Sequence, residues 1–422
     1  MHIIQRAVLV ALLFVAQSSF AQDFYKKVIN DSTLIKSGKV IKGFKQGLWI
    51  FKSPKGAYVA SGYYVDGVPD STWYLYKNNQ VDEVIMLRNG QKNGAFIIYE
   101  QGTGLALLQA GYKNDKLEGQ YTEYHFDGSP SLQGYYANGK KDSLWVEFDE
   151  YRRPTFKQRY KNGLSAGEWV FYHSNGQVEI RQHYTNGYLD GAYEENYKSG
   201  MPYIRATYQY GSLNGQYKEY FPTGGVSVKG KYESGQKTDV WMTMTETGSV
   251  YSIGDYKNDL KHGHWKYFYP SGALELEGQY LHDQKNDQWM EYYESGKLKS
   301  IGSFKLDLKN GLWGHFYQNG QLKQDEHWKN GYLLEVSDYY TGKGAKLPKG
   351  TFSNGNGVKY TYYADGTLQS EETFVGGEAN GPAKYYSDNG DLESQGQYEE
   401  NEASGTWQYF NKRGKVIREK TF

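Results

Sequence analysis

A period of 24 residues runs through most of the chain and constrains its fold more than any other feature. Nine of the ten tryptophans fall at one phase of this period: Trp49, Trp73, Trp145, Trp169, Trp241, Trp265, Trp289, Trp313 and Trp407. A fixed period of roughly 20 to 50 residues is typical of a repeat array, in which each repeat packs against its neighbours. The sequence therefore predicts one long array rather than several globular domains.

Each repeat obeys one rule, counted from an anchor position. The rule is an aromatic residue at 0 and at +3, glycine at +7, glycine or a small residue at +13, and an aromatic residue at +15. Where tryptophan is absent, the anchor position holds Phe96, Tyr121, Tyr193, Tyr217, Val336, Lys359 or Ala383. With few aliphatic residues in the chain, the aromatic rings must supply most of the buried area. The anchors are therefore predicted to be structural.

The repeat from Trp265 to Tyr280 shows why a β-hairpin is expected. Trp265 to Tyr269 is rich in β-favouring aromatic residues, Pro270 to Gly272 carries turn residues, and Leu274 to Tyr280 alternates apolar and polar side chains. A polar connection then leads to Trp289. The predicted fold is all-β: an elongated single-layer antiparallel meander of about 16 stacked 24-residue hairpins, spanning residues 45–422.

Two details of the hairpin follow from strand geometry. Positions 0 and +3 lie on opposite faces of a flat strand, so either the strand carries a bulge or aromatic rings line both faces; the bulge is the favoured interpretation. A glycine at +13 is expected to lie across the hairpin from the anchor ring, with the ring packed on bare backbone. The glycines at this position are Gly62, Gly134, Gly230, Gly254, Gly278, Gly302 and Gly396.

The ends and one internal stretch depart from the rule. Residues 1–21 resemble a secretory signal peptide, with Arg6, an apolar run and a small-x-small site ending at Ala21. This predicts an exported protein that is periplasmic, outer-membrane-associated or extracellular. Residues 22–44 are a lead-in or N-terminal cap, either a capping hairpin or a trailing segment. The array is irregular around 332–357, which predicts a kink or an insertion loop.

Composition and spacing argue against several functional classes. The 48 basic and 48 acidic residues are interleaved, so no basic field would attract nucleic acid, and membrane contact is expected to be at most peripheral. The chain has no cysteine, its histidines are scattered, and no nucleophile, paired-carboxylate or phosphate-binding motif stands out. We therefore expect no enzyme activity, no catalytic residues, no cofactor and no metal.

Several short motifs resemble MORN repeats: Y-x-Y-Y-A-D-G-T-L at Tyr360 to Leu368, Y-x-N-G ending at Gly163 and at Gly187, and N-G-x-W at Asn310 to Trp313. The resemblance is strongest to the variant class in the bacterial YwqK-type antitoxin family and extends over residues 45–422. It implies a single-layer sheet of stacked hairpins. It also implies a protein-interaction scaffold, contact with phospholipid in some members, or an immunity partner of a toxin, and it carries no catalytic residues.

Two functional interpretations remain open from the sequence. The first is an exported, non-enzymatic scaffold that binds a protein partner through exposed aromatic residues and polar inter-hairpin loops, with residues 332–357 as the best single candidate. The second is a cell-envelope glycan-binding module that uses the Trp and Tyr ladder, because the G-x-W-x-x-[YF]-[YF] rhythm is also similar to choline-binding and other cell-wall-binding repeats.

Overall fold

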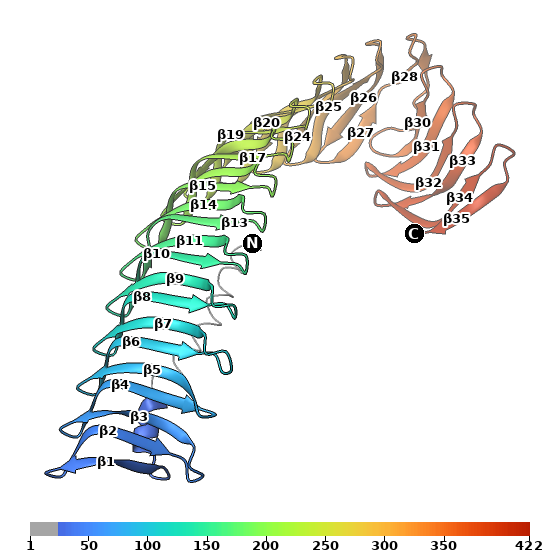
Figure 1. Ribbon diagram of the computed structural model, residues 1–422. Helices are drawn as coiled ribbons and strands as arrows, with labels where there is room; N and C mark the ends of the chain where they lie inside the picture. The colour runs from blue at the N-terminus through green and yellow to red at the C-terminus, as the bar shows by residue number, and fades with distance from the viewer. Residues whose placement is uncertain (1–23) are drawn as a thin grey trace. The chain divides into compact units, whose positions relative to one another are not determined.

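The computed structural model describes residues 24–422, and the predicted signal peptide lies outside this range. The chain divides into two units, Met1–Gly200 and Met201–Phe422. Within each unit, strands that follow one another in sequence pair antiparallel in a single layer, as Figure 1 shows. The predicted all-β meander of hairpins is thereby confirmed.

Within residues 24–200, unit 1 contains one short helix and fifteen strands. These are α2 Phe24–Asn30, β1 Ile35–Ile41, β2 Phe44–Lys52, β3 Tyr58–Val65, β4 Val68–Lys77, β5 Gln80–Arg88, β6 Gln91–Tyr99, β7 Ala106–Lys113, β8 Lys116–Tyr124, β9 Pro130–Ala137, β10 Lys140–Phe148, β11 Pro154–Lys161, β12 Leu164–Ser165, β13 Gly167–Tyr172, β14 Val178–Thr185 and β15 Tyr188–Asn196.

Unit 2 contains one large sheet, β16 to β27, a two-stranded sheet, β28 and β29, and a six-stranded sheet, β30 to β35. Its strands are β16 Pro202–Gln209, β17 Ser212–Tyr220, β18 Val226–Glu233, β19 Gln236–Met244, β20 Val250–Lys257, β21 Leu260–Phe268, β22 Leu274–Leu281, β23 Gln284–Tyr292, β24 Leu298–Lys305, β25 Leu308–Phe316, β26 Leu322–Lys329, β27 Tyr332–Val336, β28 Tyr339–Tyr340, β29 Lys346–Leu347, β30 Gly357–Tyr362, β31 Leu368–Val375, β32 Glu378–Tyr386, β33 Leu392–Glu399, β34 Glu402–Phe410 and β35 Val416–Thr421.

Two kinds of turn alternate along the meander. Between β21 and β22 the chain turns through Pro270 to Gly272, and the Gly272 amide donates to the Tyr269 carbonyl at 2.8 Å. Between β22 and β23 it turns through His282 and Asp283, which both have positive φ, 51° and 68°. A two-residue turn with this geometry matches the right-handed twist of the strands it joins.

The polar connections between hairpins were expected to be loops, and this is wrong. Residues 284–287, which precede Trp289, belong to β23. Polar residues continue the strand because Asp287 takes a positive φ of 57°, which forms a bulge two residues before the anchor. In β21 the same position holds Gly263, with φ 68°, which explains the glycine of the G-x-W motif.

Aromatic rings line both faces of the sheet, so the favoured interpretation of the 0 and +3 positions is also wrong. The register does shift between +2 and +3, but the extra residue lies on the partner strand. In β23 the +3 residue Tyr292 donates its hydroxyl to Glu277, 2.9 Å away, while Trp289 pairs in register with the neighbouring Gly278. Adjacent residues of a strand point to opposite faces, so the rings of Trp289 and Tyr292 lie on opposite sides. Below, the side that carries the anchor rings is called the anchor face, and the other side the opposite face.

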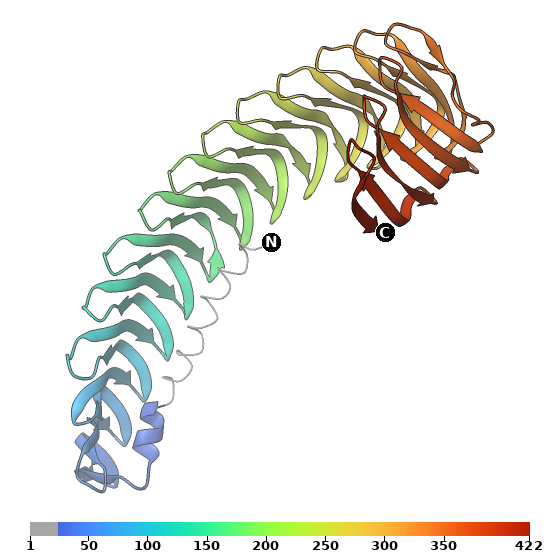
Figure 2. The same ribbon diagram turned by 90° about the vertical axis from the view of Figure 1, so that its right-hand side faces the viewer.

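The lead-in forms a helix and a strand rather than a self-contained hairpin. Strand β1 pairs with β2 and so extends the sheet by one strand, while α2 packs on the anchor face of the first repeats (Figure 2). The side chains of Tyr25 and Val28 are buried against Phe51, Trp73 and other anchor-face residues.

The irregular stretch of residues 332–357 begins with β27, continues with the short strands β28 and β29, and contributes Leu333, Val336 and Phe352 to a small core. Phe352 is fully buried and packs edge-to-face on Phe374, with ring centroids 5.3 Å apart. Glu335 accepts hydrogen bonds from Lys349, Ser353 and the Asn354 amide. The stretch is therefore a packed insertion between the sheet that ends at β27 and the sheet that begins at β30.

Candidate partner-binding surface

The anchor tryptophans pack on glycine, but on the glycine of the preceding repeat. Trp289 is 1% exposed, and a Cβ atom on Gly278 would lie 2.2 Å from its ring. The Trp289 indole Nε1 donates to the Gln279 carbonyl at 3.0 Å. The same contact pairs Gly38, Gly62, Gly134, Gly230, Gly254, Gly302 and Gly396 with Trp49, Trp73, Trp145, Trp241, Trp265, Trp313 and Trp407, respectively. Glycine is required at this position because the indole of the next repeat occupies the space that a Cβ atom would need.

Trp169 is the exception among the nine anchors. Gln158 stands eleven residues before it, where the other eight tryptophans have glycine. The Trp169 ring is only half-buried, although its Nε1 still donates to the carbonyl ten residues earlier, Arg159, at 2.8 Å. Burial of the anchor ring therefore depends on the glycine more than on the indole hydrogen bond.

The aromatic residue at +15 links one anchor to the next. Tyr280 contacts Trp265 and Trp289 edge-to-face, with centroids 6.0 and 5.0 Å apart. Phe304 makes the same contacts with Trp289 and Trp313. Edge-to-face pairs stabilise by about 0.5–1.5 kcal/mol beyond area burial, so this chain of rings forms the core of a sheet that has no second layer.

A column of lysines covers the other side of these rings in unit 2. The lysine column consists of Lys237, Lys261, Lys285 and Lys309, each four residues before its anchor. The Nζ of Lys285 lies 4.6 Å from the Trp289 ring centroid and 5.1 Å from that of Phe304. Burial lowers the pKa values of Lys285 and Lys309. The amines therefore interact with aromatic rings in place of part of their solvation by water.

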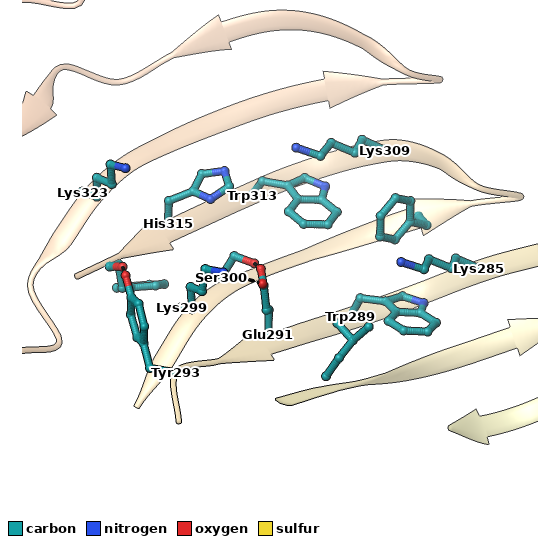
Figure 3. A pocket seen from close by; sticks show the side chains of 13 residues that line it. Lys285, Trp289, Glu291, Tyr293, Lys299, Ser300, Lys309, Trp313, His315 and Lys323 are labelled. Atoms are coloured by element: carbon teal, nitrogen blue, oxygen red, sulfur yellow. Dashed lines mark hydrogen bonds and ion pairs between the residues drawn. The ribbon is translucent and has the colours of Figure 1, made fainter. Parts of the chain in front are cut away.

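A cavity of about 410 Å³ opens on the anchor face between β22 and β26 (Figure 3). The rings of Trp289, Trp313 and Phe304 and the side chain of Leu276 supply its apolar lining. Its polar and aromatic rim consists of Lys285, Lys299, Lys309, Lys323, Glu291, Tyr293, Ser300, His315 and Phe316. The cavity thus combines flat apolar surface with several amines.

The carboxylates near the cavity already have partners. Glu291 lies 2.6 Å from the Lys299 amine and accepts from the Ser300 hydroxyl at 3.1 Å. Glu326, beside the cavity, contacts Lys359 at 2.7 Å and His315 at 3.1 Å. Burial acts to raise the Glu326 pKa, but the hydrogen bond from His315 and the charge of Lys359 outweigh it and hold the pKa well below its usual range.

Two histidines link one hairpin to the next through hydrogen bonds. His125 and His173 share the +4 position, and the Nε2 of each lies within 3.0 Å of the carbonyl of the +3 residue in the next repeat. Tyr269 and Tyr293 fill the same role through their hydroxyls. Among residues 24–422, no group of three or more His, Cys, Asp or Glu side chains is arranged to hold a metal ion.

The lysine column was missed at the sequence level, although its signal is visible there. Lysine stands four residues before the anchor at Lys45, Lys92, Lys141, Lys237, Lys261, Lys285 and Lys309. The lysines fall in segments that otherwise looked like polar loops, where lysine carries little information. Their meaning appears only once those segments are placed in strands beside the anchor rings.

Six segments match the protein-family model described as MORN repeat variant: residues 166–186, 261–282, 288–306, 309–330, 356–375 and 379–400. The segment 261–282 runs from Lys261 to the two-residue turn at His282, so the repeat of this family model coincides with the hairpin of β21 and β22. These six segments are therefore similar to MORN repeats, which indicate a scaffold for protein or membrane interaction.

Solved structures give only remote likenesses. "Crystal Structure of TcdB2-TccC3" shares 12% identity over 86% of this chain and 24% of that chain, with a TM-score of 0.14. "Structure of Photorhabdus luminescens Tc holotoxin pore, Mutation TccC3-D651A" shares 12% identity over 94% of this chain and 24% of that chain, with a TM-score of 0.13. The chain thus spans about a quarter of those chains, and the likeness carries no argument about function. No curated protein matches the sequence. No helix within residues 24–422 is long and apolar enough to cross a membrane.

Proposed function

We propose that the protein is an exported, non-enzymatic repeat scaffold that binds a partner protein on the anchor face of residues 276–323. The observation that carries the proposal is the open cavity on this face, which combines the partly exposed side chains of Leu276, Tyr293 and Phe304 with four lysines. Enrichment in aromatic residues is typical of protein interfaces. Neutralisation of a toxin, which the YwqK-type resemblance implies, would be one form of this binding.

The same face already binds a peptide segment in unit 1. There α2 packs Tyr25 and Val28 against the anchor-face residues Phe51, Trp73 and Leu75. The hydroxyl of Tyr25 also donates to the Gly90 carbonyl at 3.0 Å. The anchor face is therefore able to accept a peptide segment that crosses several strands, which supports partner binding at the corresponding face in unit 2.

Glycan binding by the Trp ladder finds less support. A sugar stacks on a free ring face, but Trp265 and Trp289 are 3% and 1% exposed. One face of each ring covers glycine, and a lysine amine lies within 5 Å of each ring centroid. Residues 332–357, which the scaffold interpretation made the best candidate for the protein contact, pack around Phe352 instead of forming an open loop.

Site-specific photocrosslinking in the native envelope tests the scaffold function. We expect a photoreactive residue at position 299, on the anchor face, to form a discrete protein adduct. The matched control is position 266, on the opposite face. The side chains of Lys299 and Lys266 are 43% and 44% exposed, and each lysine forms one ion pair with glutamate.

Two outcomes would reject the proposal. One is equal labelling at positions 299 and 266. The other is sedimentation of the full chain with peptidoglycan, lost in a Trp289 variant that still folds, with no protein adduct at position 299. Identification of the adduct by mass spectrometry would show directly whether the partner is a toxin.

A further inference from the structure

The open cavity of unit 2 has an excess of positive charge. Four lysines and one glutamate line it; that glutamate, Glu291, is paired with Lys299, and Lys309 lies 3.7 Å from the carboxylate of Glu326 beside the cavity. Among residues 24–422, the amines of Lys237, Lys261 and Lys285 make no ion pair. The Lys261 amine donates to the Tyr267 hydroxyl at 2.8 Å, while the Lys261 backbone N–H donates to the Asp283 carboxylate at 2.7 Å. These amines contact rings, which do not neutralise them, so the surface is complementary to an anion.

The amines of the lysine column recur at a fixed spacing. Successive members lie one repeat apart, that is, two strands of the sheet, or about 9.6 Å at ~4.8 Å per strand. A polyproline II segment rises ~3.1 Å per residue with three residues per turn, so every third side chain returns to the same side after about 9.3 Å. An α-helix covers the same distance in ~6.4 residues, which is not a whole number of turns.

We propose that the lysine column binds an acidic, extended segment of the partner protein whose carboxylates recur at every third residue. This rests on the scaffold function proposed above and specifies the chemistry of its ligand. The carboxylates contact the unpaired amines of Lys237, Lys261 and Lys285, and apolar side chains of the segment enter the cavity beside Leu276 and Phe304. The lowered pKa values of Lys285 and Lys309 fit amines that lack solvation and gain from a counter-charge.

The depth of the amines favours a narrow ligand over a membrane surface. The lysines of the column are half-buried, and Lys309 keeps 32% of its side chain exposed. A single extended chain is able to enter a cavity of about 410 Å³, whereas a bilayer presents its headgroups in a plane. Anionic vesicles therefore serve as a competing probe in the test.

The test measures binding of the full chain to a fluorescent peptide of four Glu-Pro-Pro triplets, by fluorescence anisotropy. We expect saturable binding that weakens as salt rises, because the contacts are ionic. An isomer with its four glutamates consecutive should bind at least about 5-fold more weakly, and the Lys-Pro-Pro counterpart should not bind. The Lys261→Gln/Lys285→Gln double variant should weaken binding about 10-fold, which corresponds to about 1.4 kcal/mol.

The matched control is the double variant Lys218→Gln/Lys266→Gln, which removes two charges one residue after the anchor, on the opposite face. It should bind the peptide as the unmodified chain does. A second test variant, Lys299→Gln/Lys323→Gln, removes rim charges without touching the column and should also weaken binding. All variants should keep the thermal unfolding midpoint of the unmodified chain within a few degrees.

Three results would overturn the inference: equal binding of both glutamate isomers, equal weakening by the control variant, or binding to anionic vesicles without binding to the peptide. If the photocrosslinked adduct at position 299 persists while the peptide neither binds nor competes, only the acidic-segment inference falls. If no adduct forms at position 299, the scaffold function itself falls.

Discussion

The anchor face has the same backbone and the same ring spacing in its first repeats and in residues 276–326, yet its lining differs. Near the N-terminus the +2 positions hold Phe51, Leu75 and Ile98, and α2 covers them. In residues 276–326 the +2 positions hold Glu291 and His315, and the face is open. One scaffold thus carries an apolar surface that is already covered and a cationic surface that is free.

The pKa values of two glutamates on this face show how the two regions differ electrostatically. Burial, with a further contribution from Asp82, raises the pKa of Glu83 to about 7 in the apolar region. Glu326 is also buried, but His315 and Lys359 hold its pKa well below the usual range. The repeat backbone therefore does not fix the electrostatics of the face. The side chains that vary from repeat to repeat on this face do.

The largest expected effect tests what both regions share. Gly62→Ala and Gly278→Ala each place a Cβ atom within 2.2 Å of the next indole ring. Each should lower the free energy of unfolding of its own unit by about 3 kcal/mol or more, because ring and strand must move apart. Chemical denaturation followed by tryptophan fluorescence measures this.

Gly225→Ala is the control for the glycine variants. Gly225 has no atom closer than 4.0 Å to its Cβ position and has no positive φ, so its substitution should change stability by less than about 1 kcal/mol. A large loss for Gly278→Ala with none for Gly62→Ala would break the claim that the two regions have the same backbone contacts.

The next effect tests the cover on the apolar region. Tyr25→Ala removes a side chain that is 1% exposed together with its hydrogen bond to Gly90. It should cost about 2–3 kcal/mol and increase binding of a hydrophobic dye, since apolar surface becomes exposed. Lys27→Ala, on the exposed side of α2, should leave both measurements unchanged. Unchanged dye binding in Tyr25→Ala would show that α2 does not cover this face.

Stability measured as a function of pH should distinguish the two glutamates, because substituting them is expected to change stability in opposite directions. The pKa of Glu83 is raised from 4.5 to about 7, so its contribution to stability is complete below about pH 4.5 and is lost as the pH rises through 7. Glu83→Gln should therefore stabilise by about 1 kcal/mol at pH 8 and have no such effect at pH 4. Thermal unfolding at the two pH values measures this.

Glu326→Gln should behave in the opposite way. The pKa of Glu326 is lowered, so its stabilisation is present above about pH 4.5 and is lost as the pH falls through that value and below. The variant should lose about 2 kcal/mol at pH 7 and progressively less towards pH 3. Parallel pH profiles for Glu83→Gln and Glu326→Gln would contradict the electrostatic difference between the two regions.

The sequence was sufficient for the hairpin, the repeat and the structural role of glycine, because period, turn residues and alternation are local properties. It was not sufficient for the face on which a ring lies, because the sequence does not show that the extra residue between the +2 and +3 positions lies on the partner strand. It also missed the candidate surface: Lys285 and Lys309 look like loop residues until the strand places them over Trp289 and Trp313. The helix α2 is only seven residues long, and a segment this short has no reliable helical period.

The smallest expected effect concerns Trp169, whose ring is half-buried because Gln158 occupies the place of the usual glycine. Gln158→Gly should let the indole settle on the strand as Trp289 does. The added burial is worth about 1 kcal/mol, while glycine within a strand costs about 0.5–1 kcal/mol, so the free energy of unfolding should hardly change. Trp169 fluorescence, measured in a background with the other anchor tryptophans and Trp328 replaced by Phe, should nonetheless shift to shorter wavelength and become less accessible to acrylamide. An unchanged spectrum would mean that glycine permits ring burial elsewhere without causing it, and the neighbouring +15 rings, Tyr160 and Tyr184, would then set the position of the indole.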